Sequence, residues 1–295
     1  MNYPCGMNQK NLPLPVNRPI KDWLATASRK LKPASESPFL EAQMLAAFVL
    51  QKPRSWLFAH LETSIDEAAL QIMDQHLIKM AQGYPFAYIC DEREFFGHVF
   101  EIHPGILVPR PETEMLVEVA LEWLKLRPDC RQVLDIGCGS GCIAVSLAAE
   151  ISDLVVTAID IDPAAVALTN HNANKHQVGS RVNSVNGDLM DQISGEFDLI
   201  CANLPYIPSG TLKDLVITRY EPILALDGGP DGLRLIEKLL YQADNHLSPG
   251  GLILLEIEST RGKLAFEMAS AVYPDANIEV LTDLAGHPRL LSIQT

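Results

Sequence analysis

The sequence has little positive charge and no long apolar run. Its 23 Lys and Arg stand against 37 Asp and Glu, for a formal net charge of -14 at pH 7. This deficit argues against nonspecific binding to a phosphate backbone, which needs many basic side chains, so we expect no direct nucleic-acid binding. No apolar run reaches the length of a membrane span, and residues 1–19 lack the apolar block of a signal peptide. We therefore expect a soluble cytoplasmic protein that makes no use of a membrane.

Cysteine pairs and metal-ligand spacings are also missing. The six cysteines are scattered and include no C-x-x-C pair, which argues against a disulfide framework and against a zinc site. The eight histidines show no spacing typical of metal ligands. We expect reduced, mostly buried thiols and no bound metal.

Composition and charge distinguish two amino-terminal segments from the rest of the chain. Residues 1–18 are rich in Pro and Asn without periodicity, so we expect no fixed structure there. Residues 19–84 space apolar side chains three and four apart, as in FLEAQMLAAFVL, which predicts a small helical domain. Up to Tyr84 there are 9 Lys and Arg against 7 Asp and Glu, and beyond it 14 against 30. This change in charge supports a domain boundary near Tyr84.

The remainder of the chain has the pattern of an α/β domain. Residues 85–114 combine aromatic and β-branched residues around Gly97 with a later Pro-Arg-Pro, which predicts a hairpin and a linker. Over residues 115–295, apolar strand-like runs alternate with helical ones. This alternation predicts a doubly wound, mostly parallel sheet covered by helices. We expect seven strands, at VLDI, LVVTAID, RVNSVN, FDLICA, LILLEI, NIEVLT and RLLSIQ.

The first of these strands ends in DIGCGSG and continues directly into a helix. Glycines allow a sharp turn and a close backbone approach, and a helix amino terminus offers free N–H groups, so we expect a nucleotide-like ligand. The pattern G-x-G-x-G departs from the dinucleotide fingerprint G-x-G-x-x-G. At the end of the second strand Asp160 can accept both ribose hydroxyls, and after the third strand Asp188 can accept an adenine amino group. A turn-forming role at a strand end stays open for both, more so for Asp188.

The fourth strand ends in Asn203-Leu-Pro-Tyr. In a doubly wound sheet it lies beside the first strand, so Asn203 is predicted to face the crevice lined by the glycine turn. The Asn203 side-chain oxygen and the Leu204 carbonyl are two acceptors suited to a planar NH2 group, which they would orient toward an activated methyl group. Pro205 stiffens this loop, and Tyr206 can stack on the planar group. The structural alternative is an Asx-type turn that ends a strand.

Two further motifs leave their interpretation open. In PRPETE, the side chains of Arg110, Glu112 and Glu114 can shape the cofactor entrance or contact substrate, but a Pro-rich helix start with acids in its first turn explains them equally well. DGGPDG is either a lid over the crevice or a pair of β-turns before a helix.

Taken together, DIGCGSG, NLPYI, LVPRPETE, EPILALDGGPDGL and DLAGHPRLL behind a helical domain resemble the HemK/PrmC family of glutamine N5-methyltransferases. The resemblance covers residues 20–294. It implies a Rossmann-like methyltransferase domain that uses S-adenosylmethionine and releases S-adenosylhomocysteine. It also implies that the helical domain grips a protein substrate, and that the acceptor is the glutamine of the Gly-Gly-Gln loop of peptide chain release factors.

The resemblance also implies site residues, with two departures from the family pattern. The family usually has Pro where this chain has Leu204, and often an aromatic residue in place of Leu189. Leu204 still presents its carbonyl but lacks the fixed φ of Pro. Three functions stay open: glutamine methylation, amino methylation of a nucleic-acid base such as adenine, and a cofactor-binding module inactivated by the Leu204 change. The implied substrate and catalytic contacts are Asn203, Leu204, Pro205 and Tyr206, and the implied cofactor contacts are Gly137, Cys138, Gly139, Ser140, Gly141, Asp160, Asp188, Leu189 and Asn203.

Overall fold

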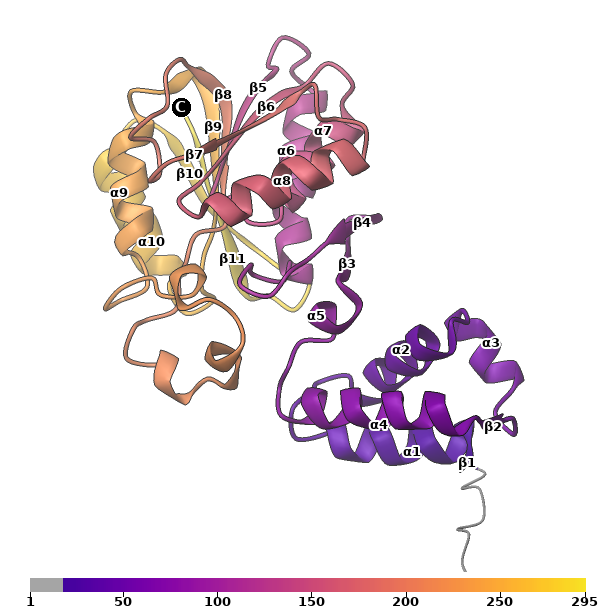
Figure 1. The fold of residues 1–295 in the computed structure, drawn as a ribbon. Helices are drawn as coiled ribbons and strands as arrows, with labels where there is room; N and C mark the ends of the chain where they lie inside the picture. The colour runs from indigo at the N-terminus through magenta and orange to yellow at the C-terminus, as the bar shows by residue number, and fades with distance from the viewer. Residues whose placement is uncertain (1–17) are drawn as a thin grey trace, which may run out of the picture. The chain divides into compact units, whose positions relative to one another are not determined.

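A computed structural model describes residues 18–295 of the chain, which form two compact units (Figure 1). One unit runs to Cys90 and the other begins at Asp91. This division lies slightly beyond Tyr84, where the charge pattern changes. The segment 1–18, for which we expect no fixed structure, lies outside the described residues apart from Arg18, which begins the first strand.

The first unit is a small helical bundle with its own core. Trp23 and Met73 are fully buried in it, and the Trp23 indole N–H donates to Asp74 Oδ1 at 2.8 Å. Its longest helix starts where the Asp66 carboxylate accepts the backbone N–H of Ala69, as a helix cap does. The elements are β1 (Arg18–Pro19), α1 (Ile20–Leu31), α2 (Pro38–Leu50), α3 (Arg54–Ala59), β2 (Ser64–Ile65), which pairs with β1, α4 (Glu67–Ala81) and α5 (Ala87–Cys90).

The second unit is built on a seven-stranded sheet in the order β10-β11-β9-β8-β5-β6-β7. The chain enters at the centre, moves outward through β6 and β7, and returns to place β8 beside β5 in parallel. Only β11 runs against its neighbours. The seven-stranded, mostly parallel sheet is thus confirmed. The strands are β5 (Gln132–Ile136), β6 (Val155–Asp160), β7 (Val182–Asn186), β8 (Phe197–Ala202), β9 (Leu247–Glu256), β10 (Asn277–Thr282) and β11 (Pro288–Gln294).

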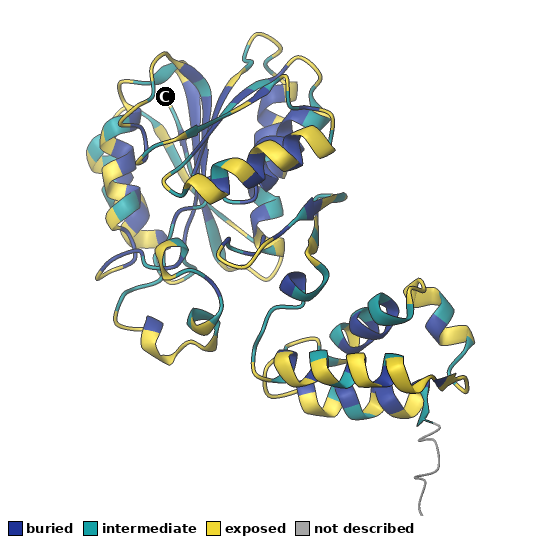
Figure 2. Cartoon of the chain, in the orientation of Figure 1, coloured by how far each residue is buried: buried dark blue, intermediate teal, exposed yellow. Residues whose placement is uncertain are grey.

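Helices cover both faces of this sheet. In Figure 1, α6, α7 and α8 lie on one side and α9 and α10 on the other. The central strands are buried, and the exposed residues are on the outward faces of the helices (Figure 2). A hairpin and four short 3-10 turns complete the unit. The remaining elements are β3 (Glu92–Phe95), β4 (His98–Glu101), η1 (Pro111–Thr113), α6 (Glu114–Lys125), α7 (Cys142–Glu150), α8 (Pro163–Lys175), η2 (Leu212–Asp214), η3 (Val216–Arg219), η4 (Ile223–Ala225), α9 (Arg234–Ala243) and α10 (Gly262–Val272).

One boundary differs from the sequence pattern. The apolar periodicity of LRLIEKLLYQADNHL predicts a helix from Leu233 to Leu247, but α9 ends at Ala243 and Leu247 already pairs with Phe197. The backbone N–H of Phe197 bonds to the His246 carbonyl at 2.7 Å. The chain therefore enters the sheet at Leu247, where the sequence pattern still predicts helix. An irregular stretch that contains Pro249 follows, and regular pairing of β9 with β8 begins at Leu252.

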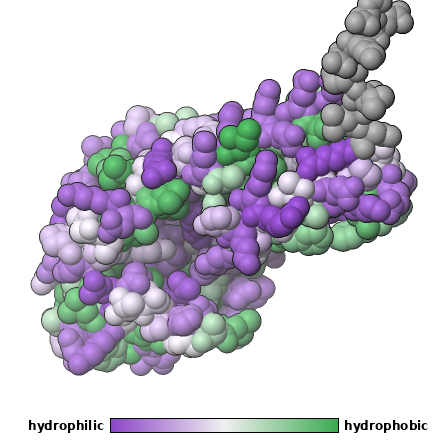
Figure 3. All heavy atoms as spheres, turned by 90° about the horizontal axis from the view of Figure 1, so that it is seen from below, coloured by the Kyte–Doolittle hydropathy of each residue, from purple (hydrophilic) through white to green (hydrophobic). Residues whose placement is uncertain are grey.

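The face of the molecule drawn in Figure 3 is largely hydrophilic. Figure 3 shows one face of the molecule, on which hydrophobic residues form small separate groups among hydrophilic ones. Between Arg18 and Thr295, no helix combines the length and the apolar character needed to cross a bilayer.

Candidate active site

The glycine turn lies at the switch point of the sheet, where β5 meets β6 on one side and β8 on the other. Gly137, Gly139 and Gly141 all have positive φ, between 57° and 80°. The N–H groups of Gly137 and Cys138 bond to the Ile159 carbonyl at 2.8 and 3.0 Å, which fixes the turn against β6. A side chain built on Gly139 would meet no atom within 4 Å. The turn therefore presents bare backbone to open space, as close approach to a ligand requires.

A cavity of about 570 Å³ opens over the carboxyl ends of these strands. Two of the residues that the sequence assigns to the site do not line it. Gly141 is the N-cap of α7, where an added Cβ would come within 2.9 Å of the Thr169 side chain, and Tyr206 lines a neighbouring cavity. The sequence-predicted residues that do line it are Gly137, Cys138, Gly139, Ser140, Asp160, Asp188, Leu189, Asn203, Leu204 and Pro205.

Asp160 ties the two cofactor-side loops together. Its Oδ2 accepts the Gly139 N–H and its Oδ1 accepts the Asp162 N–H, both at 2.9 Å. Desolvation raises the pKa of Asp160, and the two backbone N–H groups counter that rise. Each carboxylate oxygen keeps a lone pair for a further donor, such as a ribose hydroxyl.

The turn after β7 supplies Asp188 and Leu189. Asp188 Oδ2 pairs with the Lys238 ammonium group at 2.8 Å on the exposed rim of the cavity, so it shares its carboxylate with a cation. Leu189 is buried and has a φ of 49°, which is uncommon for a residue with a side chain. This conformation places Leu189 in the cavity wall, where it can cover a flat base by apolar contact.

Asp135, the acid of DIGCGSG, has a structural position that the sequence left unassigned. It is fully buried, and its Oδ2 accepts the Ala144 N–H at 3.1 Å in the first turn of α7. Burial raises the pKa of Asp135 to about 7, against the effect of that hydrogen bond. Its Oδ1 has no hydrogen-bond partner among the described residues. The buried carboxyl therefore holds α7 to β5 through Oδ2 alone.

A second cavity of about 200 Å³ adjoins the first and shares Leu107, Arg110, Asn203, Leu204 and Ala225 with it. The Leu204 side chain is buried against the glycine turn, where its Cδ2 would lie 3.2 Å from a Cβ on Gly137. The NLPY loop is thus the wall between a large and a small cavity.

The Asn203 side chain has a fixed orientation. Its Nδ2 donates to Thr113 Oγ1 at 3.0 Å. An amide held by its NH2 group presents its carbonyl oxygen on the other side. Thr113 is buried at the start of α6, in a motif for which sequence reasoning considered only the charged neighbours.

Tyr206 is also anchored. Its hydroxyl donates to Glu256 Oε1 at 3.1 Å. Burial raises the pKa of the Tyr206 phenol, and the nearby Glu256 carboxyl adds to that effect, so the phenol stays protonated. Glu256 is the last residue of β9 and the single acid in the apolar run LILLEI. This acid among apolar residues was the only feature of the sequence that could have marked Glu256 as a site residue.

The DGGPDG loop packs directly under the NLPY backbone. An added Cβ on Gly228 would come within 2.7 Å of the Pro205 carbonyl, and one on Gly232 within 2.3 Å of the Tyr206 carbonyl. Only glycine permits such an approach at these two positions. The loop is therefore part of the frame that holds NLPY.

PRPETE contributes an ion pair and a cavity wall. Arg110 lines both cavities and donates to Glu221 Oε2 at 2.7 Å. Glu221 is buried, and desolvation raises the pKa of its carboxyl while Arg110 lowers it. Glu114 accepts the Phe96 N–H at 3.0 Å, which joins α6 to the β3–β4 hairpin. The motif therefore has a structural role, and Arg110 and Thr113 also reach the site.

We expect Arg110→Met to destabilise this unit, because it leaves the Glu221 carboxylate buried without its cation. Breaking a fully buried pair costs about 3–5 kcal/mol, and the partial exposure of Arg110 reduces this to about 2 kcal/mol in the free energy of unfolding. Urea unfolding measures the change. Arg219→Met is the matched control on an exposed part of the same segment, and an equal loss there would contradict the role of the pair.

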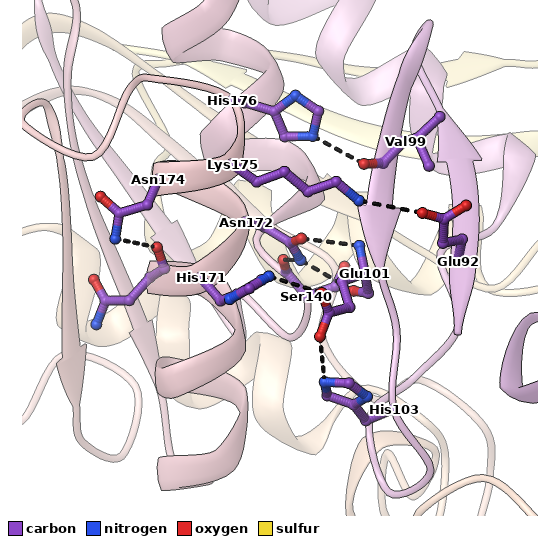
Figure 4. Close-up of polar contacts among 11 residues, drawn as sticks. Glu92, Val99, Glu101, His103, Ser140, His171, Asn172, Asn174, Lys175 and His176 are labelled. Atoms are coloured by element: carbon purple, nitrogen blue, oxygen red, sulfur yellow. Dashed lines mark hydrogen bonds and ion pairs between the residues drawn. The ribbon is translucent and has the colours of Figure 1, made fainter. Parts of the chain in front are cut away.

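Asn172 connects the hairpin to the glycine turn (Figure 4). It is fully buried on α8 and bonds to both the N–H and the carbonyl of Glu101. Its Nδ2 also donates to the Ser140 carbonyl at 2.8 Å. On the surface, the Glu101 carboxylate pairs with His103 at 2.9 Å and with His171 at 2.7 Å. Within residues 18–295 no group of three or more acids, histidines or cysteines is arranged to hold a metal ion.

Comparison with known proteins identifies both units. The family model of the PrmC N-terminal domain matches residues 22–90, and that of the methyltransferase small domain matches residues 113–220. The release factor glutamine methyltransferase of Moorella thermoacetica is 39% identical over 274 residues, which cover 92% of this chain and 96% of that protein. The chain belongs to the release factor glutamine methyltransferase family. It is therefore an S-adenosylmethionine-dependent methyltransferase, as the HemK/PrmC resemblance predicts.

Another member of this family supports the assignment, and a more distant solved structure supports the fold. The release factor glutamine methyltransferase of Nitratidesulfovibrio vulgaris is 36% identical over 281 residues, 92% of this chain and 94% of that protein. Among solved structures, the 16S rRNA methyltransferase RsmC of T. thermophilus, in complex with AdoMet and guanosine, has a TM-score of 0.51. It is 19% identical and covers 69% of this chain and 49% of that one, so it supports the fold alone.

Proposed function

We propose that this enzyme transfers a methyl group from S-adenosylmethionine to the side-chain amide nitrogen of the glutamine in the Gly-Gly-Gln loop of peptide chain release factors. The observation that carries the proposal is the Asn203 side chain, held by Thr113 at the wall between two adjoining cavities. One cavity is large enough for a nucleoside ligand, and the other is of side-chain size.

The larger cavity fits the cofactor in its chemistry. Bare backbone at Gly139, the Asp160 carboxylate and the apolar side chain of Leu189 suit a polar tail, a ribose and a flat base, in that order. S-adenosylmethionine supplies an electrophilic methyl group on a positively charged sulfur. We assign its binding to the glycine turn, Asp160, Asp188, Leu189 and Asn203.

The smaller cavity fits the acceptor amide. The amide nitrogen of glutamine is a poor nucleophile because its lone pair is delocalised. We assign its two hydrogens to the Asn203 Oδ1 and the Leu204 carbonyl, which orient the nitrogen and favour the positive charge it gains as the methyl group arrives. Pro205 limits the motion of this loop, and Tyr206 in the cavity wall packs against the planar amide.

A nucleic-acid base is the weaker candidate acceptor. Adenine offers a similar planar NH2 group, so the pocket alone does not discriminate. Arg110, a cation in the wall of both cavities, is paired with Glu221, and this carboxylate offsets the positive charge that would attract a phosphate. The relatives with 36% and 39% identity over nearly the whole chain carry the name of a protein methyltransferase, which favours a protein acceptor.

Mass spectrometry of a release factor incubated with the enzyme and labelled S-adenosylmethionine tests the proposal. We expect one labelled methyl group on the peptide that carries Gly-Gly-Gln. A release factor with Gly-Gly-Ala in that loop is the control and should stay unlabelled. Label on the control, or on RNA in place of the protein, would contradict the proposed acceptor.

We further expect the helical unit to bind the protein substrate. The unit has a core of its own, separate from that of the sheet, and none of the described residues from Arg18 to Cys90 lines either cavity. A chain that begins at Asp91 should therefore keep its affinity for S-adenosylmethionine and lose most of its kcat/KM with the release factor. Calorimetry and steady-state kinetics measure the two effects, and lost cofactor affinity in a folded truncation would contradict this division of roles.

A further inference from the structure

One buried stripe of α8 carries two polar side chains that the assignments above leave without a role in binding. The stripe consists of Ala165, Leu168, Thr169 and Asn172, at the spacing of three and four residues that defines one face of a helix. Thr169 and Asn172 have no exposed surface. Burial of a hydroxyl or an amide costs free energy unless hydrogen bonds replace those to water, so the partners of these two side chains indicate what they do.

Both polar side chains bond to carbonyl groups of the glycine turn. Thr169 Oγ1 lies 3.2 Å from the Gly139 carbonyl oxygen and 3.2 Å from Cys138 Sγ. A hydroxyl has one hydrogen, and a carbonyl oxygen is a stronger acceptor than a thiol sulfur, so Thr169 donates to Gly139. Further along α8, Asn172 Nδ2 donates to the Ser140 carbonyl at 2.8 Å. The helix thus holds two successive peptide groups of the turn by their oxygens.

The direction of a carbonyl also fixes the direction of an N–H group. A trans peptide is planar, so the carbonyl of Gly139 and the N–H of Ser140 point in opposite directions. With that oxygen held by Thr169, the Ser140 N–H points away from α8. It has no hydrogen-bond partner among the described residues, and Ser140 lines the larger cavity. The Ser140 N–H is therefore a donor left for a ligand, and a side chain behind the turn sets its direction.

The same stripe holds the segment that follows the β3–β4 hairpin. Asn172 bonds to both the N–H and the carbonyl of Glu101, as a neighbouring strand would. Further along this segment, the buried Ile106 packs with Ala165 and Leu168 and lines the larger cavity. Both hydrogens of the Asn172 NH2 group are thereby used, one on the glycine turn and one on the hairpin. One side chain thus relates two parts of the cavity wall to each other.

We propose that Thr169 and Asn172 are positioning residues for the cofactor. They direct the donor groups of the glycine turn toward S-adenosylmethionine without touching it, since neither side chain lines the cavity. The proposal concerns the cofactor alone and does not depend on which amide receives the methyl group. A purely structural role predicts a different result, because side chains that stabilise the fold equally with and without cofactor leave cofactor affinity unchanged when they are lost.

Thr169→Val tests the proposal, because it removes the hydroxyl at nearly constant shape and leaves Asn172 in place. We expect the affinity for S-adenosylhomocysteine to fall about fivefold to tenfold, the effect of about one hydrogen bond. Thr169→Ser keeps the hydroxyl and should restore the affinity to within about twofold of the parent. Thr157→Val, at a half-buried position on β6 outside the cavity wall, is the matched control and should leave the affinity unchanged. Calorimetry measures all four proteins.

Asn172→Ala should weaken S-adenosylhomocysteine binding by more than Thr169→Val, because it releases the glycine turn and the segment after the hairpin together. Urea unfolding of the ligand-free variants separates affinity from stability. A Thr169→Val protein that loses stability but binds as tightly as the parent would overturn the proposal. A Thr169→Ser protein that binds as weakly as Thr169→Val would also overturn it. If Asn172→Ala does not fold, the two Thr169 variants decide.

The peptide group held by Thr169 can be observed without ligand. With 13C-carbonyl glycine and 15N-serine, only the Gly139–Ser140 and Gly179–Ser180 peptides carry both labels, and Ser180→Ala removes the second signal. We expect the remaining signal to move in Thr169→Val, to return toward the parent position in Thr169→Ser, and to stay in place in Thr157→Val. An unmoved signal in Thr169→Val would show that the hydroxyl does not hold this carbonyl, and would refute the proposal.

Discussion

Asn203→Ala is expected to lower kcat with the release factor by on the order of a hundredfold or more, because it removes an acceptor that orients the nucleophile and stabilises the charge it gains. Affinity for S-adenosylmethionine should fall far less, since the larger cavity keeps the glycine turn and Asp160. Single-turnover kinetics with saturating cofactor measure the chemical step directly.

The control for this substitution is Asn174→Ala, an exposed asparagine on α8 whose side-chain NH2 group donates to the Asn170 carbonyl. It should leave turnover unchanged. If Asn203→Ala methylates the release factor as fast as the parent, the small cavity is not the acceptor pocket. A parent protein that binds cofactor but methylates nothing would instead favour the module inactivated at Leu204.

Asp160→Ala is expected to weaken S-adenosylmethionine binding by on the order of a hundredfold. The carboxylate is assigned two ribose hydroxyls, and hydrogen bonds to a charged group contribute about 1.5–3 kcal/mol each. The substitution also frees the Gly139 N–H, whose bond to Oδ2 holds the glycine turn toward β6. Calorimetry with S-adenosylmethionine and with S-adenosylhomocysteine measures both affinities.

Asp160→Asn is the graded control, because it keeps one acceptor oxygen and the shape of the side chain. It should lose less affinity than Asp160→Ala. NAD should not bind the parent, since the glycine turn departs from the dinucleotide fingerprint. An unchanged affinity in Asp160→Ala, or binding of NAD comparable to that of S-adenosylmethionine, would show that the cavity is wrongly assigned.

The position of Asn203 beside the glycine turn was predictable from the sequence. The positions of Thr113 and Glu256 near the site were not. Alternating strands and helices determine a parallel sheet with a switch point, and that topology alone places β8 beside β5. Thr113 and Glu256 lie 143 residues apart in the sequence. The contacts of Thr113 with Asn203 and of Glu256 with Tyr206 depend on how the start of α6 and the end of β9 pack against the NLPY loop, and no local pattern encodes that packing.

Two further features show the limits of periodicity. The pattern of α9 continues to Leu247, but sheet pairing takes over from Leu247, because tertiary hydrogen bonds outweigh helix propensity near a helix end. The Gly-Gly-Pro-Asp-Gly stretch was open to interpretation as a lid. Gly228 and Gly232 are required by their close contact with the carbonyls of Pro205 and Tyr206, which only the folded chain reveals.

The buried amide of Asn172 has a consequence for how the molecule opens. One side chain bonds to the backbone of both Glu101 and Ser140, so the hairpin and the glycine turn are held to α8 by the same amide (Figure 4). Local unfolding in proteins proceeds in cooperative units that share such bonds. We therefore expect the β3–β4 hairpin and the glycine turn to open together in hydrogen exchange, and we expect a ligand that slows the opening of the glycine turn to protect the amide of Glu101 as well.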